Sequence, residues 1–139
     1  MQPAYPLNLL FIDDDPDDGE ALQKQINIYN PSIHFLQVYD GWQAMMYLQK
    51  LAAEDMPSLI ILDINMRIIN GFEFLKVVKG EAQYKDIPVI VYSTSERIED
   101  RRLSLELGAI DFYTKPNTLA GLQAIAKIVT SICAIESLN

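Results

Sequence analysis

One carboxylate, Asp63, stands directly after an uninterrupted apolar run, residues 59–62 (LIIL), which Pro57 and a serine precede. Such a run is typical of a strand that is buried on both faces, as in a parallel sheet covered by helices. Asp63 then stands at the carboxyl end of that strand. In an open α/β sheet this edge is where ligands bind, so we take Asp63 as the centre of a candidate site.

Polar residues that could act on a phosphoryl group follow three other apolar runs: Asp13 and Asp14, Ser93, and Lys115. Clustered carboxylates repel one another and need a cation, and oxygen ligands favour a hard ion, above all Mg²⁺. A lysine and a hydroxyl beside such an ion suit a phosphoryl group. Asp63 is then the natural nucleophile, because a carboxylate can carry phosphate as an acyl phosphate. The metal and Lys115 would neutralise charge on the phosphoryl oxygens during transfer.

The elements that would position these residues alternate along the chain. The expected strands are about 7–12, 33–38, 59–62, 89–92 and 110–114, and the expected helices are about 16–29, 41–51, 71–80, 98–107 and 119–136. Short connections between alternating strands and helices favour right-handed crossovers and a parallel sheet with helices on both faces. Asp17 and Asp18 are expected to cap the first helix, and Gly108 to end the fourth.

Length and charge narrow the possible functions. At 139 residues the chain is about one domain, and half of its residues are apolar, which argues against disorder. The net charge of −8 repels nucleic-acid phosphates and anionic lipid heads, so neither nucleic acid nor a membrane is an expected partner. The single cysteine, Cys133, excludes an intramolecular disulfide and is expected in the core, and His34 is expected to be an ordinary strand residue.

The amino-terminal residues 1–12 lack a basic region and run at once into acids, so they do not resemble a signal peptide. No apolar run reaches the roughly 20 residues that a membrane span needs. We therefore expect a cytoplasmic protein.

Four separated motifs resemble the receiver domains of two-component response regulators: FIDDD at 11–15, LIILDINM at 59–66 with the following NGFEFL, VIVYSTS at 89–95, and FYTKP at 112–116. The resemblance covers the chain from about residue 7 to the last helix. It implies a doubly wound, flavodoxin-like α/β fold whose five-stranded parallel sheet has the order 2-1-3-4-5, with five helices. It also implies a single receiver domain over 1–139, with a core of about 7–136. The chain stops after the fifth helix, so no output domain is expected.

The same resemblance assigns the acceptor and the metal ligands. Asp63 corresponds to the phosphoacceptor. Asp13, Asp14 and Asp63 correspond to the acids that bind Mg²⁺, and the backbone carbonyl of Asn65 to the third protein ligand of the ion. Asp15 has no assigned role.

Three further residues correspond to those that contact the phosphoryl group or respond to it. Ser93 corresponds to the switch hydroxyl, Phe112 to the switch aromatic, and Lys115 to the lysine that contacts phosphate. The family usually has a cis peptide bond at the position of Lys115 and Pro116. Two departures are Arg67, where proline is usual, and Phe112, which keeps the aromatic bulk of a tyrosine without its hydroxyl.

Other interpretations of the acidic run are weaker. An EF-hand loop beginning at Asp13 would need glycine and glutamate where Asp18 and Lys24 stand. A haloacid-dehalogenase type of phosphatase would use Asp13-x-Asp15 as its nucleophile motif, but it would need threonine or valine in place of Asp17 and a larger chain. A receiver that only binds partners is disfavoured, because every residue of the acceptor site is present.

The apolar surface of the last helix is wider than is needed to cover one face of the sheet. Its two adjoining stripes are Leu119, Leu122, Ala126, Val129 and Cys133, and Ile125, Ile128, Ile132 and Ile135. The excess suggests a homodimer through the face made by the fourth helix, fifth strand and fifth helix. The alternative is a well-buried terminal helix.

Together these features predict a stand-alone receiver. It would take a phosphoryl group onto Asp63 from a histidine kinase or a histidine phosphotransfer protein, with Mg²⁺ as cofactor. It would then change a surface that a downstream protein reads. It would promote its own phosphorylation and dephosphorylation, and we expect no turnover of an external substrate.

Overall fold

The computed structural model describes residues 7–66 and 68–137. The elements, in chain order, are β1 (Asn8–Ile12), α1 (Pro16–Tyr29), β2 (His34–Val38), α2 (Gly41–Gln49), a short 3-10 helix (Ala53–Asp55), β3 (Leu59–Leu62), α3 (Gly71–Gly80), β4 (Val89–Ser93), α4 (Ile98–Glu106), β5 (Asp111–Thr114) and α5 (Leu119–Ser137). The strands form one parallel sheet in the order β2-β1-β3-β4-β5. The predicted fold is confirmed, with element ends within about three residues of the expected ones.

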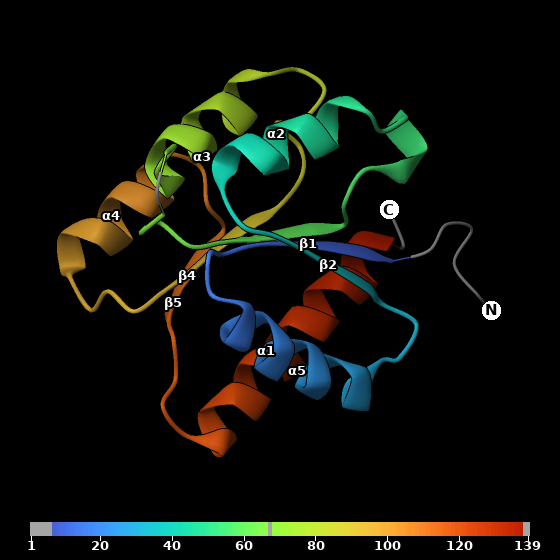
Figure 1. Ribbon diagram of the computed structural model, residues 1–139, viewed down its shortest axis with the longest axis vertical. Coiled ribbons are helices and arrows are strands. Elements are labelled where there is room, and N and C mark those ends of the chain that lie inside the picture. The colour runs from blue at the N-terminus through green and yellow to red at the C-terminus, as the bar shows by residue number, and fades with distance from the viewer. Residues whose placement is uncertain (1–6, 67, 138–139) are drawn as a thin grey trace.

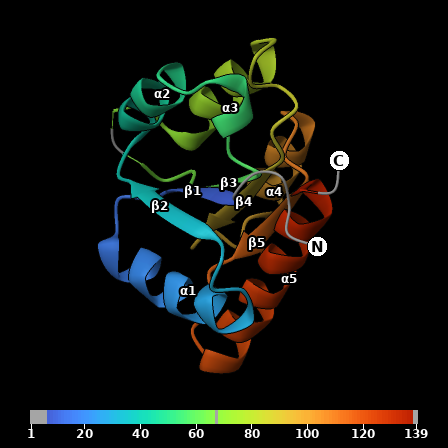
Figure 2. The ribbon, with the colours of Figure 1, turned by 90° about the vertical axis from the view of Figure 1, so that its right-hand side faces the viewer.

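Helices cover both faces of the sheet, as the continuous apolar runs of β1, β3 and β4 require. Figure 1 shows α1 and α5 on one side and α2 and α3 on the other, and Figure 2 shows the same layers from the side. Residues of β1 and β3 alternate between the two cores: Leu10 and Ile60 face α2 and α3, whereas Leu9 and Leu59 face α1 and α5. β3 lies in the middle of the sheet, so Asp63 follows its most enclosed strand.

Side-chain caps determine where three of the helices begin. Asp40 accepts a hydrogen bond from the backbone N–H of Gln43, at 2.7 Å, and Asn70 accepts one from Glu73, at 3.0 Å. The cap of α1 is Asp15, which accepts from the Asp17 N–H at 2.9 Å. The prediction that Asp17 and Asp18 cap this helix is therefore wrong: both lie inside its first turn, where their charges still favour the helix N-terminus.

Three expectations about single residues are confirmed. Gly108 follows α4 with a φ of +109°, a backbone conformation that glycine adopts without strain. Cys133 is fully buried, and His34 lies exposed in β2. In the described residues, no helix is both long enough and apolar enough to cross a membrane.

Candidate functional site

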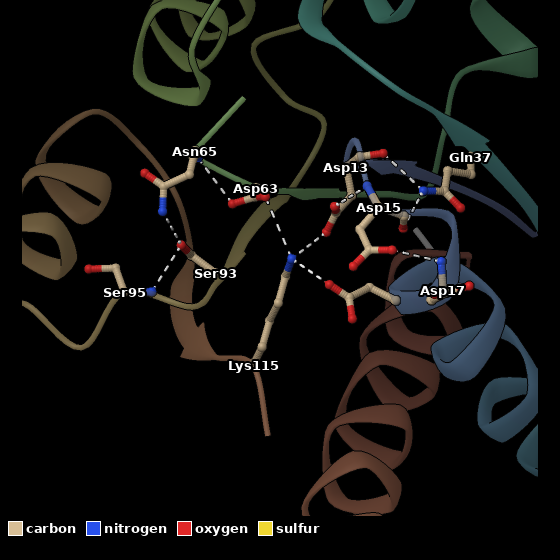
Figure 3. A network of polar contacts seen from close by, with 10 residues as sticks. Asp13, Asp15, Asp17, Gln37, Asp63, Asn65, Ser93, Ser95 and Lys115 are labelled. Carbon is tan, nitrogen blue, oxygen red and sulfur yellow. Dashed lines mark hydrogen bonds and ion pairs between the residues drawn. The ribbon is translucent and has the colours of Figure 1, made fainter. Parts of the chain in front are cut away.

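The candidate site lies at the carboxyl edge of the sheet, where the ends of β1, β3, β4 and β5 meet. Figure 3 shows Asp13, Asp63, Ser93 and Lys115 converging there from these four strand ends. Asp13 is completely buried and Asp63 is 5% exposed, although both are acids. Buried carboxylates are costly unless a cation or hydrogen bonds compensate them, so their burial here indicates a built site.

Asp63 is held by backbone contacts on both sides. Its Oδ1 accepts a hydrogen bond from the Asn65 N–H, at 3.1 Å. The start of α3 packs directly on the Asp63 carbonyl, because a Cβ at Gly71 would lie 2.6 Å from that oxygen. Gly71 therefore permits a close approach that fixes the loop after β3.

The acidic loop after β1 has a brace from the neighbouring strand. Gln37, on β2, donates through Nε2 to the backbone carbonyls of Asp13, at 2.9 Å, and Asp15, at 3.0 Å. A Cβ at Gly19 would lie 1.8 Å from Gln37 Oε1, so glycine leaves room for this side chain. Sequence reasoning missed Gln37, because a polar residue in an edge strand looks like an ordinary solvent-facing position.

Lys115 joins the acids at the centre of the site. Its Nζ lies 2.7 Å from Asp13 Oδ2, 2.8 Å from Asp18 Oδ2 and 3.5 Å from Asp63 Oδ2, and its side chain is only 10% exposed. Burial by itself would lower the pKa of Lys115, but the hydrogen bonds to Asp13 and Asp18 and the charge of Asp63 raise it above its usual range. These contacts therefore favour the charged form of the lysine. The position of Asp18 in this site was not predicted.

Asp13 is the acid with the strongest perturbation. Burial raises its pKa from 3.8 to about 6, against the opposing effects of the Lys115 hydrogen bond and the Asp15 N–H. Asp13 Oδ1 accepts from that N–H, at 2.9 Å, and the buried Oδ2 pairs with the Lys115 ammonium, at 2.7 Å. Oδ2 of Asp13 therefore already faces one cation, the ammonium of Lys115.

The residues present fit a divalent metal ion. Carboxylate oxygens of Asp13, Asp14 and Asp63 lie within 4.8 Å of one another. Asp14 is exposed, so the group opens to solvent on one side. An all-oxygen set with an open side suits an ion that keeps several waters, as Mg²⁺ does. The predicted metal role of the Asn65 carbonyl stays a prediction.

Ser93 is fully buried at the end of β4, with its hydroxyl oriented toward the loop after β3. Its Oγ accepts from Asn65 Nδ2, at 3.3 Å, and from the Ser95 N–H, at 3.2 Å. Ser95 in turn donates to Asp100 of α4, at 2.5 Å. Phe112 lies buried in the core beneath the site, and its carbonyl accepts from Arg101 of α4, at 3.0 Å. The switch role implied for Phe112 stays a prediction.

One expectation about the backbone is wrong. No peptide bond between described residues is cis, so the bond between Lys115 and Pro116 is trans. The trans form is the intrinsically favoured one, by about 0.5–1 kcal/mol for a bond before proline. Lys115 reaches the three acids from this trans backbone. Arg67, where the family usually has proline, lies outside the described residues.

Comparison with known proteins agrees with this geometry. Residues 9–127 match the family model of the response regulator receiver domain. The chain is 36% identical over 120 residues to the response regulator GtcR of Aneurinibacillus migulanus, a match that covers 86% of this chain and 45% of GtcR. The chain thus spans about half the length of the curated relatives it matches.

Two solved structures are similar over nearly their whole length. The phosphorylated cyanobacterial phytochrome response regulator RcpA superposes with a TM-score of 0.83 at 29% identity, covering 94% of this chain and 95% of RcpA. The Mn²⁺-bound form of response regulator Rcp1 superposes with a TM-score of 0.80, also at 29% identity, covering 91% of this chain and 93% of Rcp1.

Proposed function

The chain belongs to the response regulator receiver family, and from this premise we propose that it accepts a phosphoryl group on Asp63. The observation that carries the proposal is the environment of this carboxylate. Asp63 is nearly buried at the end of the central strand, within 3.5 Å of a charged lysine and beside two further acids that could hold a metal ion. The phosphorylated state of RcpA and the metal-bound state of Rcp1 support the same role.

The proposed donor is a phosphohistidine on a histidine kinase or a histidine phosphotransfer protein. A carboxylate oxygen of Asp63 attacks the phosphorus, an O–P bond forms, and the P–N bond to the imidazole breaks. The imidazole leaves with its electron pair and takes a proton from solvent. Attack of water on the acyl phosphate later returns the Asp63 carboxylate and releases inorganic phosphate. The proposed chemistry is therefore limited to phosphorylation and dephosphorylation of Asp63, without turnover of an external substrate.

The site residues have separate tasks in this proposal. Lys115 places a fixed positive charge beside Asp63, where charge develops on the phosphoryl oxygens. Asp13, Asp14 and Asp63, with the Asn65 carbonyl, would hold Mg²⁺, which when bound supplies further positive charge against those oxygens. Partial enclosure by the surrounding strands strengthens each of these interactions relative to water.

The proposed switch begins at Ser93. A phosphoryl oxygen on Asp63 would offer the Ser93 hydroxyl an acceptor, and Ser93 now accepts from Asn65 and Ser95. Because Ser95 is bonded to α4 and Arg101 of α4 is bonded to Phe112, a shift of Ser93 would reach the surface made by α4 and β5. A downstream protein would distinguish the two populations at that surface.

We further propose that the chain works in the cytoplasm, through contacts with other proteins. Its acidic surface disfavours direct contact with nucleic acid or membrane, so the proposed partners are proteins. They are a phosphodonor, a downstream target and a second copy of the chain, the last through the face of α4, β5 and α5. On α4 that face offers Ile98, which is 73% exposed.

A small phosphodonor tests the acceptor directly. Incubation with acetyl phosphate and MgCl₂ should add one phosphoryl group to the wild-type protein by intact mass, and EDTA should prevent the addition. The Asp63→Asn variant should stay unlabelled, because an amide is a poor nucleophile. The control is Asp86→Asn, since Asp86 is exposed in the connection before β4, at the opposite end of that strand. Undiminished labelling of Asp63→Asn would contradict the proposal.

A further inference from the structure

The ammonium of Lys115 lies closer to the first turn of α1 than to the acceptor. Its Nζ is 2.8 Å from Asp18 Oδ2 but 3.5 Å from the nearest oxygen of Asp63. Asp18 and Lys115 are 97 residues apart in the sequence, so the pair depends on the packing of α1 beside the end of β5. In this state the lysine gives its shortest contacts to Asp13 and Asp18.

The first turn of α1 presents Asp18 to the lysine by its own geometry. The Asp15 cap and Pro16 fix the start of the helix, and Asp18 lies two residues into it. The neighbouring Asp17 carries the same charge in the same turn, but its carboxylate pairs with no described cation. The Asp18 side chain is 37% exposed, whereas that of Asp13 is 1% exposed, so Asp18 can exchange the lysine for water at a lower cost.

We propose that Asp18 is a positioning residue that acts through Lys115. It holds the ammonium on the α1 side of the site and competes for it with the phosphoryl group entering on Asp63. This inference rests on the proposed function. An ammonium has three N–H donors, and Asp13 and Asp18 take two of them at short distance. The Asp18 charge also cancels part of the lysine's field at Asp63, where a phosphoryl group needs it.

The main test compares two variants that lose the same charge from the same helical turn. With acetyl phosphate and MgCl₂, Asp18→Asn should label Asp63 about three to ten times faster than Asp17→Asn, as expected for the loss of one partly exposed charged hydrogen bond. Both changes remove one negative charge from the first turn of α1. Equal rates in the two variants, or slower labelling of Asp18→Asn, would overturn the proposal.

A second comparison asks whether the effect passes through the lysine. In a Lys115→Met background, labelling should be slower, and the difference between Asp18→Asn and Asp17→Asn should disappear. A difference that persists without Lys115 would show that Asp18 acts through charge or folding alone, which contradicts a positioning role.

A measurement without phosphorylation separates this inference from the proposed function. In the metal-free protein, the ammonium hydrogens of Lys115 should exchange with water faster in Asp18→Asn than in wild type or Asp17→Asn, as followed by NMR on ¹⁵N-lysine protein. An unchanged exchange rate of the Lys115 ammonium hydrogens would refute the proposal that Asp18 positions Lys115. Absence of label on wild-type Asp63 would contradict the proposed function and the competition together, whereas a labelled wild type with equal variant rates would contradict Asp18 alone.

Discussion

The burial of the Asp13 carboxylate costs free energy, and it also favours the binding of a cation. The Asp13 carboxylate has lost its water, and one lysine must compensate it together with Asp18 and Asp63. The raised pKa of Asp13 is the direct consequence of this arrangement. A metal ion would relieve the same excess of negative charge, so the cost in the metal-free state favours cation binding.

The pKa of Asp13 leads to a prediction about stability without metal. Its value is about 6 in the folded protein and 3.8 in an ordinary peptide, so between these values the folded state binds a proton that the unfolded state does not. The free energy of unfolding should therefore fall as the pH rises from about 4 to about 6, and stay lower above that range. In Asp13→Asn this fall should be absent, leaving the variant more stable than wild type at pH 7 by up to about 3 kcal/mol.

Urea unfolding in EDTA at pH 4.5 and pH 7 measures this difference. The control, Asp17→Asn, removes an exposed carboxylate from the first turn of α1, and its difference from wild type should hardly change with pH. A wild type whose stability relative to Asp13→Asn is the same at both pH values would refute the prediction.

At the scale of elements, the junction between β3 and α3 sets the geometry of the acceptor. α3 begins immediately beside the backbone of Asp63, and only a residue without a side chain fits at its first position. The two apolar stripes of α5 are buried to different extents. Ala126, Val129 and Cys133 are fully buried against the sheet, while the second predicted stripe is partly buried and ends in the exposed Ile135.

Two glycines of α3 form a matched pair for testing this junction. A Cβ at Gly71 would lie 2.5 Å from Ile64 Cα, whereas a Cβ at Gly80 would have nothing within 4 Å. Gly71→Ala should therefore lower the free energy of unfolding by about 2 kcal/mol or more, because backbone atoms must move. Gly80→Ala should leave it unchanged or raise it by about 0.5 kcal/mol, since alanine favours helix.

Urea unfolding of both variants decides this prediction, and labelling with acetyl phosphate adds a functional readout. Gly71→Ala should also slow the labelling of Asp63, because the displaced backbone carries the acceptor. Equal stability of the two variants would show that the loop after β3 adapts freely.

At the scale of the whole molecule, the net charge and the exposed apolar residues support the proposed partners. The net charge of −8 makes self-association through the acidic edge unfavourable, so a second copy must meet another face. α4 carries Ile98 and Leu105 seven residues apart, on one side of the helix and both exposed. This is the face on which we place the proposed homodimer.

Sedimentation of the protein with and without a phosphoryl mimic, beryllofluoride with MgCl₂, tests the dimer. The mimic should increase the dimer fraction, and Ile98→Ser should weaken dimerisation about tenfold or more by removing buried apolar area. Ile28→Ser is the control, because Ile28 is 69% exposed but lies on α1. A protein that stays monomeric at high concentration in both states would exclude this homodimer.

The local sequence by itself determined the fold class, the strand order through its family motifs, and the placing of Asp13, Asp63, Ser93 and Lys115 at one edge. It could do so because apolar runs record which elements are buried, and the carboxyl ends of parallel strands must meet. The buried position of Cys133 followed from the apolar pattern of the last helix.

Only the tertiary structure decided which side chains touch within that edge. Asp15 caps α1, Gln37 braces the acidic loop, and Asp18 rather than Asp17 holds Lys115. A pattern of residue types cannot show which of two adjacent aspartates in one helical turn forms an ion pair, because the two differ only in the direction in which their side chains leave the helix. Asp18 meets its partner only because α1 packs beside the end of β5, which brings Lys115, 97 residues away in the sequence, next to it.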